Sequence, residues 1–156
     1  MKRLMTTLVM ALAFMFGALG AVDSDGPALV TQAQAAEAKV SVAVIKATKT
    51  GTIDEKSKKY SSVTSQVGGF SGFTFVTDTS FSATVGAPVD KKLAGRTLTV
   101  LVKSASGDKV STAVTVVDPN GQKHAVSSST KPGASVVVAA KSADGTEAHL
   151  FIVTVH

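Results

Sequence analysis

Residues 97–116, with the sequence TLTVLVKSASGDKVSTAVTV, decide the fold of this chain. Leu98, Val100 and Val102 occupy every second position, and the same period resumes after the turn signal Ser106-Gly107-Asp108. Successive side chains of a strand point to opposite faces, so this alternation predicts two strands joined by a hairpin. Abundant valine and threonine favour strands as well, because β-branched side chains fit a pleated surface.

Shorter stretches of the same pattern occur along the chain, with turn residues about every 8 to 12 positions. The clearest turn is Asp118-Pro119-Asn120-Gly121, where proline presets φ and the Asn-Gly pair accepts positive φ. This rhythm predicts a mainly β fold, a single-domain antiparallel β-sandwich of about eight strands, with a partly open β-barrel as the alternative. The strands are expected near residues 39–48, 73–75, 81–85, 97–102, 110–116, 123–129, 136–138 and 150–155.

The first and last of these strands carry apolar residues on both faces. In the first, Val40, Val42 and Val44 share one face, while Ala43 and Ile45 lie on the other. Burial of both faces is typical of a strand inside a sheet. The two terminal strands are therefore predicted to be buried and to be neighbours.

The segments between strands are predicted from turn and helix signals. Asp78-Thr79-Ser80 reads as a turn between two strands, and Gly86 to Gly95, which contains Pro88, reads as a polar loop. Thr52-Ile53-Asp54-Glu55 fits a capping box with Thr52 as the N-cap. One short amphipathic helix is expected to follow the first strand and to dock an apolar stripe on a sheet, formed by Ile53, Tyr60, Val63 and Val67.

The N-terminal segment has the features of an export signal. Met1-Lys2-Arg3 is cationic, residues 4–22 carry no charge, and Ala33-Gln34-Ala35 offers small residues to a signal peptidase. The sequence predicts a signal peptide over residues 1–35 and a β-sandwich domain over 36–156, located in the periplasm or outside the cell. Cleavage after Gly20 and an uncleaved membrane anchor are the alternatives.

The amino-acid composition limits the classes of partner that this protein is expected to bind. Cysteine is absent, so packing and hydrogen bonds must stabilise the domain without disulfides, and the formal net charge is +5. Attraction to an anionic envelope surface, such as lipid headgroups or acidic polysaccharide, is one interpretation, and a solubilising coat is the other. Nucleic acid is not expected, because no basic motif with flanking aromatic residues occurs. The basic residues form two clusters in the sequence: Lys56, Lys58 and Lys59, and Lys91, Lys92 and Arg96.

Few residues are candidates for catalysis, ligand binding or metal binding. Phe70 lies in the flexible stretch Gly-Gly-Phe-Ser-Gly, where it could contact a partner or cover the end of the helix. His124 and His149 fall on different predicted strands, without the close spacing of metal ligands. Asp108, Asp118 and Asp144 stand in turns, where turn chemistry alone favours aspartate. The sequence therefore predicts no catalytic site, metal or cofactor.

The order of features resembles small exported β-domains of unknown function from Gram-negative bacteria. The similarity lies in Lys39 to Ile45, Ile53-Asp54, Phe70 to Phe73, Gly95 to Val100, and Leu150 to Val155. It implies a compact, mostly β fold and attaches no activity or site residues.

Together these features predict an exported, non-catalytic β-domain that binds or scaffolds in the cell envelope, with another envelope protein as a possible partner. An enzyme, such as a hydrolase with an unrecognised site, and a strand-exchanging fibre subunit are the alternatives.

Overall fold

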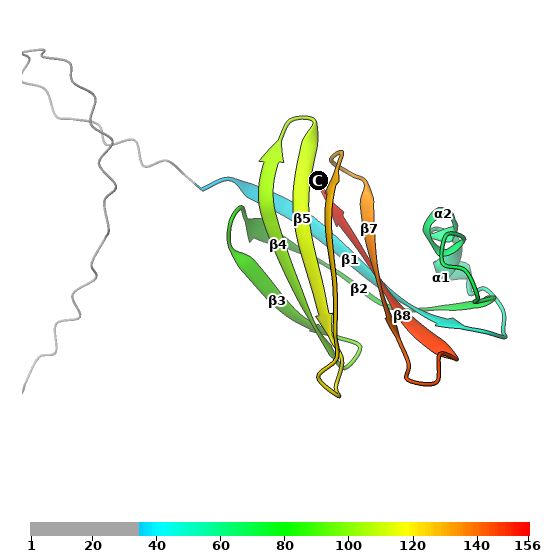
Figure 1. Cartoon of the computed structure of the whole chain (residues 1–156). Helices are drawn as coiled ribbons and strands as arrows, with labels where there is room; N and C mark the ends of the chain where they lie inside the picture. The colour runs from blue at the N-terminus through cyan, green and yellow to red at the C-terminus, as the bar shows by residue number, and fades with distance from the viewer. Residues whose placement is uncertain (1–34) are drawn as a thin grey trace, which may run out of the picture. The chain divides into compact units, whose positions relative to one another are not determined.

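The computed structural model describes residues 35–156, which form two antiparallel four-stranded sheets (Figure 1). The first sheet has the strand order β2-β1-β8-β7 and the second has the order β3-β4-β5-β6. The predicted β-sandwich is confirmed, and the sheets do not close into a barrel. The elements are β1 (Glu37–Thr48), α1 (Glu55–Lys58), α2 (Ser61–Thr64), β2 (Gly72–Thr84), β3 (Pro88–Leu93), β4 (Arg96–Ser106), β5 (Lys109–Val117), β6 (Lys123–Thr130), β7 (Ser135–Lys141) and β8 (Glu147–Val155).

The two terminal strands are neighbours at the centre of the first sheet, as predicted. Val40 of β1 lies opposite Val155 of β8, and both strands have a second partner on their other side. Ile45 and Leu150 point away from the sandwich interior and are still fully buried. Both faces of this sheet are therefore covered around its centre.

The main core lies between the sheets and consists mostly of valine. Each fully buried aliphatic side chain contributes roughly 1.5–3 kcal/mol through removal of apolar surface from water. The predicted alternation in residues 97–116 is confirmed, because its inward-facing members are buried. The core includes Val40, Val42, Val44, Phe151 and Val153 from the first sheet, and Leu98, Val100, Val102, Val114 and Val116 from the second.

A second apolar cluster covers part of the outer face of the first sheet. The segment that contains α1 and α2 packs on this face through Tyr60, Val63, Val67 and Phe70. The predicted stripe thus docks on a sheet, with Phe70 in place of Ile53, which is 49% exposed. Beneath the segment lie Ala43, Ile45, Ala47, Phe73, Ala148, Leu150 and Ile152.

The predicted N-cap is wrong, because Asp54 occupies that position instead of Thr52. Asp54 Oδ1 accepts from the backbone N–H of Lys56 at 3.1 Å, and its Oδ2 accepts from that of Phe75 in β2 at 3.2 Å. One carboxylate therefore caps α1 and also binds the edge of the first sheet.

The residues before Asp54 extend along β2 and do not begin a helix. The Thr52 carbonyl accepts from the Phe73 N–H at 3.1 Å, and Ile53 forms a parallel bridge with Phe73. This strand pairing holds Thr52 out of the helix, so tertiary contacts override the local capping box. The helical segment is also divided in two, since serine is a poor helix former.

The predicted turn at Asp78-Thr79-Ser80 is wrong, because β2 runs through it without interruption. The register against β1 shifts between Val44 and Ile45, which leaves Val76 as the extra residue of a bulge. Phe73 before the bulge points outward, whereas Phe81 after it packs in the inner core. The bulge therefore moves odd-numbered residues from one face to the other.

The predicted loop from Gly86 to Gly95 contains an edge strand, β3, that the sequence analysis missed. Pro88 opens this strand, at a position where proline is tolerated at a sheet edge. Ala94 and Gly95 have φ of 51° and 72°, which suits the two-residue hairpin to β4. The sequence predicted two strands where β2 is a single one, and it did not predict β3. These two errors cancel, so the expected number of about eight strands is correct.

The predicted signal peptide falls almost entirely outside the described residues, which begin at Ala35, its last residue. The alternative cleavage site after Gly20 also lies outside them. Neither helix in residues 35–156 has the length and apolar character needed to cross a bilayer.

Candidate functional site

The outer face of the first sheet changes from polar to apolar along its strands. A row of four hydroxyl residues crosses it, with Ser80 opposite Ser41, Ser41 opposite Thr154, and Thr154 opposite Ser135. The next row toward the helices contains Asp78, Ala43 and Ile152. The helical segment packs on the apolar residues of this face and ends before the row of hydroxyl residues. The surface is hollowed where the two meet.

A pocket of about 180 Å³ lies at this border, and we call it the Tyr60 pocket. Ala43 and Ile152, both buried, contribute an apolar floor, and Tyr60 from the turn between α1 and α2 lines the side. Asp78 from β2 adds a carboxylate. Hydroxyl groups come from Ser41, Ser80 and Thr154.

Hydrogen bonds hold the hydroxyl side of the Tyr60 pocket in place. Ser41 Oγ lies 3.2 Å from Ser80 Oγ and 3.4 Å from Nε2 of the C-terminal His156. Thr154 Oγ1 lies 2.8 Å from Ser135 Oγ on the neighbouring strand. Each hydroxyl can donate one hydrogen and accept two, so this row keeps capacity for a ligand.

The first predicted basic cluster lies beside the pocket, but its three lysines have different environments. Lys59 Nζ lies 4.8 Å from the Tyr60 ring centroid, 5.5 Å from that of Phe75, and 3.9 Å from Asp78 Oδ2. Lys56 Nζ lies 5.8 Å from the Phe75 centroid. Lys58 instead pairs with Glu55 within α1.

The second predicted basic cluster does not form one patch. Lys91 and Lys92 are adjacent in β3 and therefore lie on opposite faces of the strand. Lys91 Nζ lies 5.2 Å from the Phe81 ring centroid. Arg96 is largely buried and pairs with Asp118. The remaining candidate, Phe70, is half-buried and packs on the outer-face cluster, and both its role as a partner contact and its role as a cover of the helix end stay predictions.

A charged cluster closes one end of the sandwich interior. Arg96 Nε donates to Asp118 Oδ1 at 2.5 Å, and His124 Nε2 lies 2.9 Å from Asp118 Oδ2. Burial alone would raise the pKa of Asp118, but the hydrogen bonds of His124 and Arg96 and the Arg96 charge together lower it. The sequence predicts only a turn at Asp118, so this cluster is not predicted from it.

His149 is half-buried near the same end, on the inner side of β8. Burial lowers its pKa, and the positive charges of Arg96 and Lys46 lower it further. His149 is therefore held toward its neutral form.

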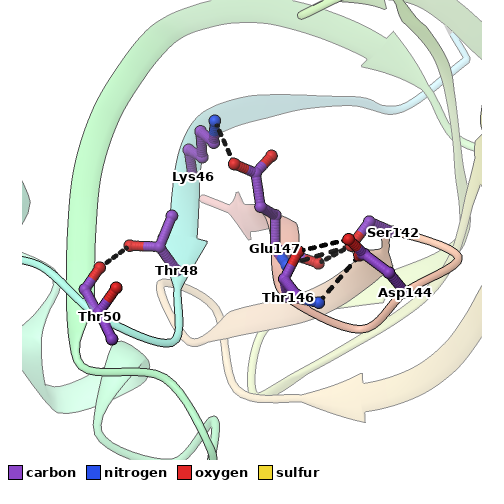
Figure 2. A network of polar contacts seen from close by, with 7 residues as sticks. All are labelled: Lys46, Thr48, Thr50, Ser142, Asp144, Thr146 and Glu147. Atoms are coloured by element: carbon purple, nitrogen blue, oxygen red, sulfur yellow. Dashed lines mark hydrogen bonds and ion pairs between the residues drawn. The ribbon is translucent and has the colours of Figure 1, made fainter.

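Figure 2 shows a polar network around the hairpin between β7 and β8. The Ser142 hydroxyl donates to Asp144 at 2.6 Å, and Thr146 donates to the same carboxylate through its N–H and its hydroxyl. These bonds, that of Ser142 first, lower the pKa of Asp144 to about 2. Lys46 Nζ lies 2.8 Å from Glu147 Oε1 and links β1 to β8. The network organises the hairpin and explains why aspartate is used there.

The other chemical candidates are spread over the domain. Asp108 and Asp118 lie at opposite ends of β5, and the part of the chain from 35 to 156 shows no cluster of three or more potential metal ligands. In the same residues, His124 contacts a carboxylate but no hydroxyl group, and the one histidine–hydroxyl contact joins His156 to Ser41. That the protein is not an enzyme stays a prediction.

Comparisons with known proteins give no match: no family model, no curated protein and no solved structure is similar to this chain. The resemblance to exported bacterial β-domains therefore stays a prediction, and function must be inferred from the chain's own residues.

Proposed function

We propose that this chain is an exported, non-catalytic module that binds a polyhydroxylated ligand, with the chemistry of a sugar, in the Tyr60 pocket. One observation carries the proposal. An aromatic ring, an apolar floor and convergent oxygen atoms meet in a single hollow of about 180 Å³. Ligand sites combine apolar walls with a few placed polar groups in this way.

The pocket suits the two surfaces of a sugar ring. Its C–H face can pack on Tyr60 and on the floor of Ala43 and Ile152, because both are apolar. Its hydroxyl groups can donate to the Asp78 carboxylate and exchange hydrogen bonds with Ser41 and Ser80. In this proposal the pocket binds its ligand through packing and hydrogen bonds, and no catalytic step is assigned to it.

A neutral saccharide tests the pocket. The methyl ester of trigalacturonate is titrated into ¹⁵N-labelled protein, and amide shifts are expected in β1, β2 and β8 around the pocket. Ser80→Ala should weaken binding roughly two- to tenfold by removing one hydrogen-bonding group. Ser82→Ala is the matched control, since Ser82 lies two residues along the same face, outside the pocket. Absence of binding, or equal loss in both variants, would contradict the proposed site.

Export is tested separately by the mass of the protein recovered from producing cells. A chain that begins at Ala36 is expected from the small residues before it, and a start at Ala21 would identify the alternative site. A full-length chain retained in the membrane fraction would contradict export as a processed protein.

A further inference from the structure

We infer that the ligand of the Tyr60 pocket is an acidic saccharide whose carboxylate is bound by Lys59 and Lys56. This inference rests on the proposed function of the pocket and adds the class of sugar. It depends on where the ammonium groups of Lys56, in α1, and Lys59, directly after α1, lie relative to the pocket.

Lys59 lies next to the pocket and is held there by two aromatic rings. Its ammonium group lies within about 6 Å of the Tyr60 and Phe75 ring centroids, the range of cation–π attraction. Its pairing with Asp78 is long, at 3.9 Å, and both side chains are more than half exposed. Water screens such a pair strongly, so Lys59 stays available to a second anion.

Lys56 reinforces this positive edge. Its ammonium group shares the Phe75 ring with that of Lys59. Of the two carboxylates that contact these residues, Asp54 accepts from the backbone N–H groups of Lys56 and Phe75, and Asp78 forms only the long pair with Lys59. An anionic group on the ligand would add a partner for the ammonium groups of Lys59 and Lys56. Lys58, by contrast, already has a partner in Glu55 of its own helix.

The distribution of charge favours a saccharide over a membrane surface. Binding to anionic lipid requires several basic residues on one open face. In this protein the second basic cluster is divided, with Arg96 buried against Asp118 and Lys91 set over Phe81. Lys59, however, which follows α1, adjoins a pocket lined with hydroxyl groups, which suits a sugar that carries an acid.

The experiment compares trigalacturonate with its methyl ester, which has the same shape without the charge. We expect native protein to bind the acid more tightly than the ester. Lys59→Gln should weaken binding of the acid roughly two- to fivefold and leave the ester unaffected. Lys58→Gln is the control, because it removes the same charge from an equally exposed side chain, 59% against 57%.

The outcomes separate the two proposals. Equal binding of acid and ester, or equal weakening by Lys58→Gln and Lys59→Gln, would overturn the acidic specificity and leave the sugar pocket standing. Absence of binding by either saccharide would overturn both. Binding to phosphatidylglycerol vesicles that is abolished by Lys59→Gln, without binding to trigalacturonate, would assign the lysines to a membrane surface and refute the inference.

Discussion

Asp54→Ala should destabilise the domain far more than Thr52→Ala. The Asp54 side chain caps α1 through the Lys56 N–H, and loss of an N-cap costs about 1 kcal/mol. It also accepts from the part-buried Phe75 N–H, and a hydrogen bond to a charged group is worth about 1.5–3 kcal/mol. Since the two terms are not additive, we expect a loss of about 2–3 kcal/mol, a large part of the total stability of a domain. Thr52 is exposed, so its replacement should cost less than about 0.5 kcal/mol.

Urea unfolding followed by far-UV circular dichroism measures both losses, and Asp54→Asn separates the two functions of Asp54. Asparagine caps helices as well as aspartate does, but its amide nitrogen cannot accept from Phe75. Asp54→Asn should therefore retain the cap and lose the bond to the sheet edge, with an intermediate stability. If Thr52→Ala cost as much as Asp54→Ala, or if Asp54→Asn matched native protein, the assignment of two functions to this carboxylate would be refuted.

Three further changes test the packing and the charges. A Cβ on Gly72 would lie 2.4 Å from Thr48 Oγ1, so Gly72→Ala should cost about 1–3 kcal/mol in urea unfolding, while Gly68→Ala, which meets no atom within 4 Å, should not destabilise. Phe151→Ala should cost about 3–5 kcal/mol in the same assay, because Phe151 is fully buried. The lowered pKa of Asp118 means that the unfolded chain takes up this proton first as pH falls. The stability that ionised Asp118 adds to the folded domain should therefore be fully present above its ordinary pKa of 3.8. This stability should be lost as the pH falls through the lower pKa of the folded state. Asp118→Asn should remove that part of the pH dependence below the ordinary pKa of 3.8, and an unchanged curve would contradict it.

Much of the fold follows from the alternation of apolar residues, and the errors arose where the alternation breaks. Phe73 and Phe81 are eight residues apart, a spacing that places two residues on one face of a regular strand, but the bulge at Val76 separates them onto opposite faces. A bulge depends on pairing with β1 and has no local signal comparable to that of a turn. Pro88 suggested a loop because proline disrupts inner strands, whereas at an edge its missing N–H is harmless.

The charged cluster could have been located from hairpin geometry. The turns that join β4 to β5 and β5 to β6 place Arg96 and His124 beside the end of β5, next to Asp118. The bulge near Val102 shifts this register by one residue, which sequence counting does not reveal. The Tyr60 pocket was beyond sequence reasoning, because its residues come from β1, β2, β8 and the helical segment, whose packing angle no motif encodes.

The pairing of β1 with β8 determines how the protein responds to mechanical load. The antiparallel register brings Lys39 and His156 together at one end of the sheet, where the His156 N–H donates to the Lys39 carbonyl. A force that pulls the two ends of the domain apart therefore acts on one hydrogen bond after another, like a zipper, and does not shear the whole ladder at once. Tension applied at Glu37 and His156 would separate β1 from β8 progressively from this end, so the domain should yield at low force.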